Sequence, residues 1–167
     1  EITFEFWMNP SDNGNFIMAK QDNFNVAEGY SFIINSSGYI LFSLNNNQNN
    51  NQIRVTGSST IPLNQWIHVA LTYNGSSNAN AVKIYVNGAR ETETINANTL
   101  TATTVTTEEF YIGCREGCTF DDFNGTIDEV AIYNRSLTAS EIRQHYEMHK
   151  AEFLSKIIDT GFNNTQY

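Results

Sequence analysis

The stretch GTIDEVAIYNRSLTASEI, residues 125–142, joins a strand pattern to a helix pattern. Its first half is rich in β-branched and aromatic residues, which is typical of a strand. In its second half Thr138 precedes Glu141 by three residues, the spacing of a capping box, in which each side chain accepts a hydrogen bond from a backbone N–H of the first helical turn. Leu137 and Ile142 stand at the positions of a hydrophobic staple. The stretch therefore predicts a strand followed directly by a helix.

Strand patterns occupy most of the chain before this stretch. Residues 2–8 alternate in side-chain character with period two, and residues 29–44 read as a hairpin around NSSG. Residues 66–73 are largely apolar or aromatic on both faces, and residues 82–86 end at Asn87-Gly88, a strong hairpin signal. Short strands at regular spacing predict an all-β fold, a two-sheet antiparallel β-sandwich or jelly roll with one short C-terminal helix.

Other segments are expected to lie outside this sheet pattern. The tract NNNQNNNQ, residues 45–52, is polar and without periodicity, so we expect a solvated loop there. The helix should end near Met148, and SKIIDTGF, residues 155–162, looks like the first strand of another domain. We therefore expect one domain over residues 1–148, and over residues 149–167 a linker and the start of a following domain of a longer chain. The alternative is that this tail folds back onto the first domain.

The charge of the chain restricts its partners. The 167 residues include nine Lys and Arg against 18 Asp and Glu, and the net charge is −9 at pH 7. A phosphate backbone would be repelled by this field, so nucleic acid is not an expected partner. The sequence has no apolar run of the roughly 18–20 residues that a membrane-spanning helix needs, so we expect no membrane insertion by this segment.

Two features favour an exported protein. Cys114 and Cys118 are close enough in CREGC to form a disulfide across a tight turn, which suits an oxidising compartment. The competing interpretation is half of a zinc site, but no second Cys or His pair stands at ligand spacing. Five Asn-x-Ser/Thr glycosylation signals add weak support, at Asn35, Asn74, Asn124, Asn134 and Asn163. We expect an extracellular or cell-surface location.

Five motifs together carry a family resemblance. In chain order they are ITFEFWMNP, WIHVALTYNG, VKIYVNG, FYIG and FNGTIDEVAIYNRSLTASEI. They resemble the laminin-G-like domains of the concanavalin A-like lectin/glucanase superfamily, over about residues 1–146. The resemblance implies a concanavalin A-like jelly roll of two curved sheets, and a non-catalytic module that binds calcium, sugars or other proteins. Members usually carry an additional N-terminal strand, and the expected domain lacks it, which would leave a sheet edge open.

The sequence offers no catalytic constellation. Relatives that hydrolyse β-glucans carry acids spaced E-x-D-x-x-E on one strand, and this spacing does not occur here. Asp128 and Glu129 are neighbours in a strand and should point to opposite faces, which argues against a carboxylate pair. Glu141, His145 and His149 stand one helical turn apart, a spacing that a metal site and an ordinary solvated face share. We expect no catalytic residues and no enzymatic activity.

Calcium is the cofactor that the resemblance implies. In the superfamily the Asp of a D-x-V-x-x-Y strand commonly joins backbone carbonyls in a structural calcium site, and Asp128 matches that pattern. Calcium readily combines a few carboxylates with carbonyl and amide oxygens. Asp22 and Glu28 are candidate additional ligands. The alternative role for Asp128 is a hydrogen bond with neighbouring turn N–H groups.

A ligand site is expected in two loops. Sugar-binding surfaces place aromatic faces beside amide and carboxylate partners. Two loops combine these side chains, with Asp22, Asn23, Phe24 and Asn25 in one, and Phe120, Asp121, Asp122, Phe123 and Asn124 in the other.

We therefore predict a non-catalytic binding or adhesion module of a secreted or cell-surface multi-domain protein. Its expected partner is a glycan or an extracellular protein, with structural calcium as the expected cofactor. The alternative is a carbohydrate-binding accessory domain of a secreted glycoside hydrolase. The sequences beside residues 1 and 167 would separate the two.

Overall fold

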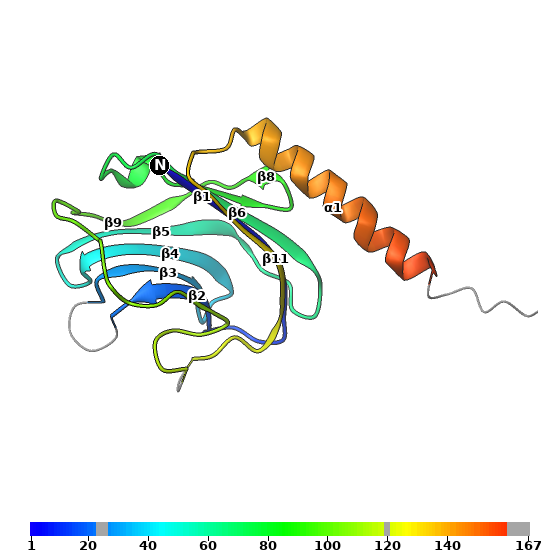
Figure 1. Ribbon diagram of the computed structural model, residues 1–167, viewed down its shortest axis with the longest axis horizontal. Coiled ribbons are helices and arrows are strands. Elements are labelled where there is room, and N and C mark those ends of the chain that lie inside the picture. The colour runs from blue at the N-terminus through cyan, green and yellow to red at the C-terminus, as the bar shows by residue number, and fades with distance from the viewer. Residues whose placement is uncertain (23–26, 119–120, 160–167) are drawn as a thin grey trace, which may run out of the picture.

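The protein is a sandwich of two antiparallel sheets (Figure 1). Its structure is a computed structural model that describes residues 1–22, 27–118 and 121–159. From residue 152 onward only the backbone is described. The five-stranded sheet has the order β11-β1-β6-β7-β8, from strands Gly125–Tyr133, Ile2–Pro10, Ile67–Tyr73, Lys83–Val86 and Ala89–Arg90. The six-stranded sheet has the order β10-β2-β3-β4-β5-β9, from strands Tyr111–Ile112, Phe16–Gln21, Gly29–Ile34, Tyr39–Asn47, Asn51–Thr60 and Thr94–Asn98. A short 3-10 helix, η1, spans Ala79–Ala81. The predicted fold class is confirmed.

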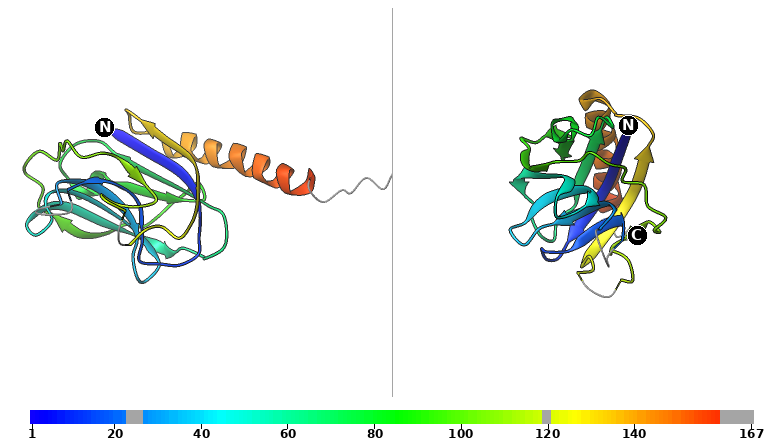
Figure 2. Two further views of the ribbon diagram at one scale, coloured as in Figure 1. Left: turned by 60° about the horizontal axis from the view of Figure 1, so that its bottom comes forward. Right: turned by 90° about the vertical axis from the view of Figure 1, so that its left-hand side faces the viewer.

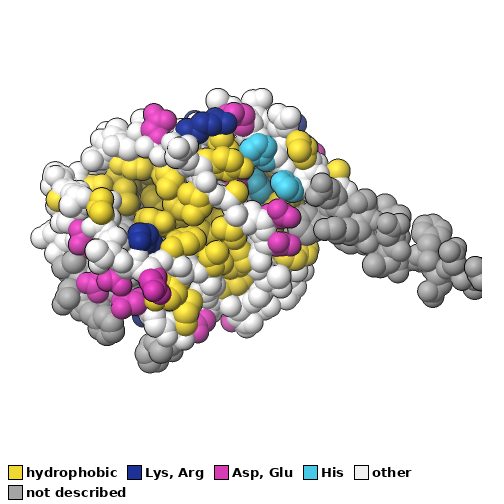
Figure 3. All heavy atoms as spheres, viewed as in Figure 1, with side chains coloured by type: hydrophobic (Ala, Val, Ile, Leu, Met, Phe, Trp, Pro, Cys, Tyr) yellow, Lys and Arg dark blue, Asp and Glu magenta, His cyan; other side chains and the backbone are white. Residues whose placement is uncertain are grey.

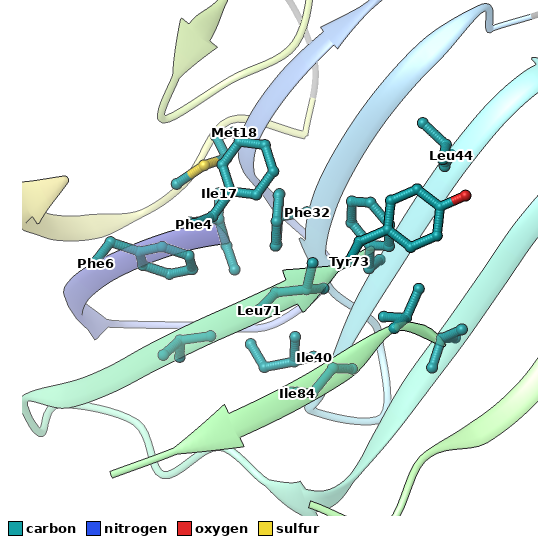
Figure 4. Packing of buried hydrophobic residues seen from close by; sticks show 14 of the residues in the cluster. Phe4, Phe6, Ile17, Met18, Phe32, Ile40, Leu44, Leu71, Tyr73 and Ile84 are labelled. Atoms are coloured by element: carbon teal, nitrogen blue, oxygen red, sulfur yellow. The ribbon is translucent and has the colours of Figure 1, made fainter. Parts of the chain in front are cut away.

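Aromatic and aliphatic side chains fill the space between the two sheets (Figure 4). Phe4 on β1 packs edge-on against Phe32 on β3, with ring centroids 4.9 Å apart, and Phe32 packs against Phe42 on β4 at 5.0 Å. Each of these rings is almost completely buried. Burying large apolar side chains from both sheets is the main source of stability in such a sandwich.

The predicted hairpins are present. Strands β3 and β4 pair antiparallel around Gly38, which has a φ of +83°. Asn87 and Gly88, with φ values of +50° and +72°, connect β7 to β8 in the conformation that a two-residue hairpin turn requires.

The prediction for the Asn-rich tract is wrong over most of its length. β4 continues to Asn47 and β5 begins at Asn51, because Asn45 pairs with Gln52 and Asn47 with Asn51. Backbone ladder bonds to a neighbouring strand extend both strands here, although the side chains carry no strand signal. β2 and β9 were not predicted at all, and β9 too forms by pairing with β5.

The helix α1, Ala139–Asp159, begins as predicted and ends later. The Thr138 backbone N–H donates to Glu141 Oε2 at 2.8 Å, and the Glu141 N–H donates to Thr138 Oγ1 at 3.2 Å, so the capping box is confirmed. The expected end near Met148 is wrong, since good helix formers continue without Gly or Pro through Asp159. Residues 155–159 are therefore helical and start no strand. Residues 160–167 lie outside the described part.

The helix leaves the sandwich after its first turns. Leu137 and Ile142 are buried against Ala70 and Tyr85, on the outer face of the five-stranded sheet. The rest of α1 projects away from the sandwich (Figure 2). Residues 149–159 thus add no strand to either sheet, and the proposed domain boundary at residue 148 stays a prediction.

The predicted disulfide is present, with the sulfurs of Cys114 and Cys118 at 2.00 Å. Within the part of the chain that the structure describes, no helix is both long enough and apolar enough to cross a membrane.

Candidate functional site

The outer face of the six-stranded sheet carries a band of polar side chains. Because Phe32 on β3 and Phe42 on β4 point into the core, Ser31 and Ser43 point to the opposite face. Ser31 pairs with Ser43, and Ser43 pairs with Arg54 on β5, so these side chains form one row across three strands.

A second row lies beside the first and makes the face hollow. Gln21 pairs with Gly29, Gly29 with Asn45, and Asn45 with Gln52. Gly29 has a φ of +124°, and a Cβ there would lie 1.9 Å from the Lys20 carbonyl oxygen, so no side chain fits. No side chain therefore stands between Gln21 and Asn45 in this row.

These rows form a groove of about 160 Å³, which we call the polar groove. Its lining consists of amides, hydroxyls, two guanidinium groups and a few apolar side chains. The lining residues are Phe16, Gln21, Ala27, Ser31, Ile33, Ser43, Asn45, Gln48, Gln52, Arg54 and Arg115.

Two buried amide oxygens in the polar groove lack partners. Gln21 is 5% exposed and Asn45 is 3% exposed, and neither Gln21 Oε1 nor Asn45 Oδ1 accepts a hydrogen bond from any described residue. A buried acceptor without a donor costs about 1–3 kcal/mol. A donor that reached either oxygen would remove this cost.

The two arginines of the polar groove differ in their surroundings. The Arg115 guanidinium lies 5.1 Å from the centre of the Phe16 ring and pairs with Asp121, at 3.4 Å between Nη2 and Oδ2. Arg54 is exposed and forms no ion pair with a described residue.

A shallow polar depression of about 460 Å³ extends this surface along β4 and β5. Thr56, two residues beyond Arg54, lines it and donates from its hydroxyl to Asn96 Oδ1 at 2.7 Å. Tyr39 supplies an aromatic ring at the same depression. Aromatic rings beside amides and hydroxyls are the chemistry that sugar surfaces use.

The described residues of the two loops predicted to bind ligand lie at opposite ends of β2, and the polar groove lies between them. Asp22 follows Gln21 at one end, where its backbone N–H donates to the Glu28 carbonyl at 3.1 Å. Asp121 lies at the other end, where its carbonyl accepts from the Phe16 N–H at 2.8 Å, and Asp122 forms a bridge with Phe16.

The remaining residues of these loops either contact neighbouring residues or lie outside the part of the chain that the structure describes. Phe123 packs against the core, and Asn124 Nδ2 donates to Asp12 Oδ2 at 3.2 Å. Glu28 Oε1 accepts from Asn46 Nδ2 at 3.3 Å. Asn23, Phe24, Asn25 and Phe120 lie outside the described residues. The ligand-binding roles of both loops stay predictions.

Asp128 lies on the other sheet, in the edge strand β11. Its Oδ1 accepts from the backbone N–H of Glu129 at 2.8 Å, which is the alternative role considered for it. This is one exposed carboxylate, whereas calcium takes six to eight oxygens, and none of the described residues form a group of three or more acids, His or Cys placed to hold a metal. A calcium role for Asp128, Asp22 or Glu28 stays a prediction.

The expected separation of Asp128 and Glu129 onto opposite faces is wrong. Trp7 pairs with Asp128, and Glu5 pairs with Ala131. Between these two pairs β1 advances by two residues and β11 by three, so β11 carries one extra residue. Glu129 has a φ of +51° and lines a cavity on the outer face, while Val130 packs on the core. A bulge of this kind interrupts the alternation on which the prediction depended.

That cavity, about 180 Å³, lies between α1 and the outer face of the five-stranded sheet. Glu5 Oε2 lies 2.8 Å from His145 Nδ1, and Glu5 Oε1 lies 3.8 Å from His68 Nε2. Burial of the His68 imidazole, together with the charges of His149 and His145, lowers the pKa of His68 to about 4. The nearby Glu5 carboxylate favours the protonated form of this ring, but the effect of burial is larger. In Figure 3 histidine side chains gather beside acidic side chains where the helix leaves the sandwich.

The helical group Glu141, His145 and His149 is not assembled as a metal site. The Glu141 carboxylate is engaged by Arg135, at 2.6 Å from Nη2 to Oε1, and by Thr138. Hydrogen bonds from Arg135 and Thr138 lower the pKa of Glu141 to about 2. His145 contacts Glu5 instead, so Glu141 and His145 do not share a ligand site.

An apolar cavity of about 330 Å³ opens between the two sheets, where Figure 3 shows hydrophobic side chains in a hollow. Phe4, Tyr30, Leu44 and Tyr73 line it and belong to the core or pack against it. Lys20, at its lining, donates from Nζ to the Glu108 carbonyl. Such a lining offers few polar groups to a hydroxyl-rich ligand, whereas the polar groove offers many.

Sequence reasoning missed the residues of the polar groove. Ser31, Ser43 and Asn45 alternate with buried residues, so their outward direction was readable from the pattern. Which outward positions of different strands meet depends on strand order, which no local pattern contains.

The fold and the polar groove together describe a lectin-like β-sandwich module. The sequence matches the family model Laminin_G_3, described as the concanavalin A-like lectin/glucanases superfamily, over residues 1–143. The protein therefore belongs to this family, and the resemblance seen in its motifs is confirmed. A comparison with curated proteins gave no match.

Solved structures show the same fold at low sequence identity. The Ruminococcus gnavus IT-sialidase CBM40 bound to alpha2,3 sialyllactose is 14% identical, with a TM-score of 0.70, and the match covers 87% of this chain and 82% of that chain. The native heptameric SAP-like pentraxin from Limulus polyphemus is 16% identical, with a TM-score of 0.55, and the match covers 85% of this chain and 67% of that chain.

Proposed function

We propose that this domain is a non-catalytic glycan-binding module that binds its ligand in the polar groove. The observation that carries the proposal is the pair of buried, unpartnered amide oxygens, Gln21 Oε1 and Asn45 Oδ1. Sugars present several hydroxyl donors in a small volume, and such donors can satisfy these acceptors once the amide side chains turn toward the groove. Ser31, Ser43 and Gln52 add hydroxyl and amide groups on the same face.

The family and the structural neighbours support this proposal. One structural neighbour is a CBM40 bound to sialyllactose, and the family model is that of lectin-like and glucanase domains. The disulfide and the family both fit an extracellular location. We propose a module of a secreted or cell-surface protein. The alternative, an accessory domain of a secreted glycoside hydrolase, uses the same groove.

A glycan-array screen with and without calcium tests the proposal, followed by calorimetric titration of the best glycan. We expect Asn45→Ala and Gln21→Ala each to weaken binding at least tenfold, because each removes a buried acceptor for a ligand hydroxyl. Gln144→Ala, on the exposed face of α1, is the control and should bind like the wild type.

Thermal unfolding separates this role from a structural one. Asn45 Oδ1 has no donor among the described residues, so Asn45→Ala removes an unsatisfied group and should not lower the melting temperature. Wild-type affinity in both groove variants, or uniform silence on the array, would contradict the proposal and favour a protein partner.

A further inference from the structure

The polar groove concentrates positive charge in an acidic protein. The chain carries only nine Lys and Arg residues and a net charge of −9, yet Arg54 and Arg115 both line this small groove. They stand on opposite sides of it, because Arg54 is on β5 while Arg115 follows β10, beyond β2. Three strand spacings, roughly 14 Å, separate the backbones of β2 and β5, which leaves room for a sugar between the two side chains.

No acidic side chain is among the described residues that line the polar groove. Asp22 and Glu28 lie in the loop beyond its Gln21 end, and Asp121 holds Arg115 from the other end. Arg54 has no acidic partner among the described residues, and it lies exposed beside Ser43.

A guanidinium group has a specific chemical preference. Its planar N–H donors match two oxygens of a carboxylate or sulfate, and such charge-assisted bonds are stronger than bonds to neutral hydroxyls. We propose that the polar groove selects glycans that carry a carboxylate or sulfate group, and that Arg54 is the specificity-determining residue that binds this group. This inference rests on the proposed glycan-binding function. Arg115, already oriented by Phe16 and Asp121, faces the groove from the other side.

The test uses matched oligosaccharides that differ in one group: a carboxylated sugar, its neutral amide, a sulfated sugar and its unsulfated parent. We expect Arg54→Gln to weaken binding of the acidic member at least tenfold and to leave the neutral member within twofold. Arg54→Lys keeps the charge but loses the planar guanidinium, so its affinity for the acidic member should fall between that of the wild type and that of Arg54→Gln. Arg143→Gln, on the exposed face of α1, removes the same unit of charge elsewhere and should bind like the wild type.

The carboxylate and sulfate arms identify which acidic group is preferred, and a clear preference for either over its neutral partner supports the inference. Raising the salt concentration should weaken wild-type binding of the acidic glycan more than that of Arg54→Gln. Equal affinity for acidic and neutral members, with binding still lost in Asn45→Ala, would overturn the inference and leave the proposed function standing. If Asn45→Ala and Gln21→Ala both bind like the wild type, or if no glycan binds, the proposed function fails, and the inference fails with it.

Discussion

Glu5 on β1 and His145 on α1 are in direct contact although 140 positions separate them in the chain, with Glu5 Oε2 at 2.8 Å from His145 Nδ1. Next to them Trp7 stacks on Tyr146, with ring centroids 5.8 Å apart. These contacts attach the first half of the helix to the outer face of the five-stranded sheet. They make the helix part of the domain, and they can be tested separately from ligand binding.

Removing the charge of Glu5 should destabilise the domain. Glu5 is 4% exposed and faces two imidazole rings, so Glu5→Gln weakens a buried charge-assisted contact. We expect a loss of about 1–3 kcal/mol in the free energy of unfolding, measured by urea denaturation at pH 7. Glu147→Gln, exposed on the same helix, is the control and should change stability by less than about 0.5 kcal/mol. Equal stability of the two variants would contradict this role for Glu5.

Stability should fall as the solution is acidified from pH 6.5 toward pH 4. His68 is 1% exposed and its pKa is lowered to about 4, from an ordinary value of 6.5. Between these values the unfolded chain binds a proton at His68 that the folded chain does not, so protonation favours unfolding. The full loss would be at most about 3 kcal/mol, reached near pH 4.

Melting curves at several pH values, for the wild type and for His68→Gln, check this prediction. Both proteins share their other titrating groups, including Glu141, whose lowered pKa of about 2 acts at lower pH. The difference in melting temperature between them should therefore shrink as the pH falls below 6.5. Parallel curves across this range would show that His68 does not account for the acid sensitivity.

A side chain at residue 88 should disturb helix docking. Gly88 has a φ of +72°, and a Cβ there would lie 2.9 Å from Tyr146 Cδ1. Gly14 has a φ of +93° with no atom within 4 Å of its Cβ position, so Gly14→Ala has the backbone cost alone. We expect Gly14→Ala to cost about 1–2 kcal/mol and Gly88→Ala to cost more. The decisive measurement is a double-mutant cycle with Tyr146→Ala, in which the costs should not add. Strict additivity would mean that the ring does not oppose the new methyl group.

Asp128 can be assigned by comparing stability with and without calcium. Its carboxylate caps the Glu129 N–H, so Asp128→Ala should cost about 0.5–1.5 kcal/mol even in the presence of a chelator. The calcium hypothesis predicts a further rise in melting temperature when calcium is added to the wild type, absent from Asp128→Ala. Identical melting of the wild type in chelator and in calcium would reject the metal and leave Asp128 its turn hydrogen bond.

Short-range patterns carried most of the fold prediction. The capping box of Thr138 and Glu141, the Asn87-Gly88 turn and the Cys114–Cys118 disulfide each involve residues within a few positions of one another. Their geometry follows from local backbone preferences. The prediction that assumed unbroken alternation was wrong at the bulge beside Glu129, and the helix continued beyond its predicted end.

The sequence by itself determined the all-β fold class, most of the strands, the start of the helix, the family and the acidic character of the protein. Only the tertiary structure brought Gln21, Asn45 and Arg54 together, from three strands, into one groove. It also decided that Glu5 meets His145. Alternation along a strand states only that a side chain points outward. The groove exists because strand order and register place outward positions of different strands side by side, and these follow from packing the whole core.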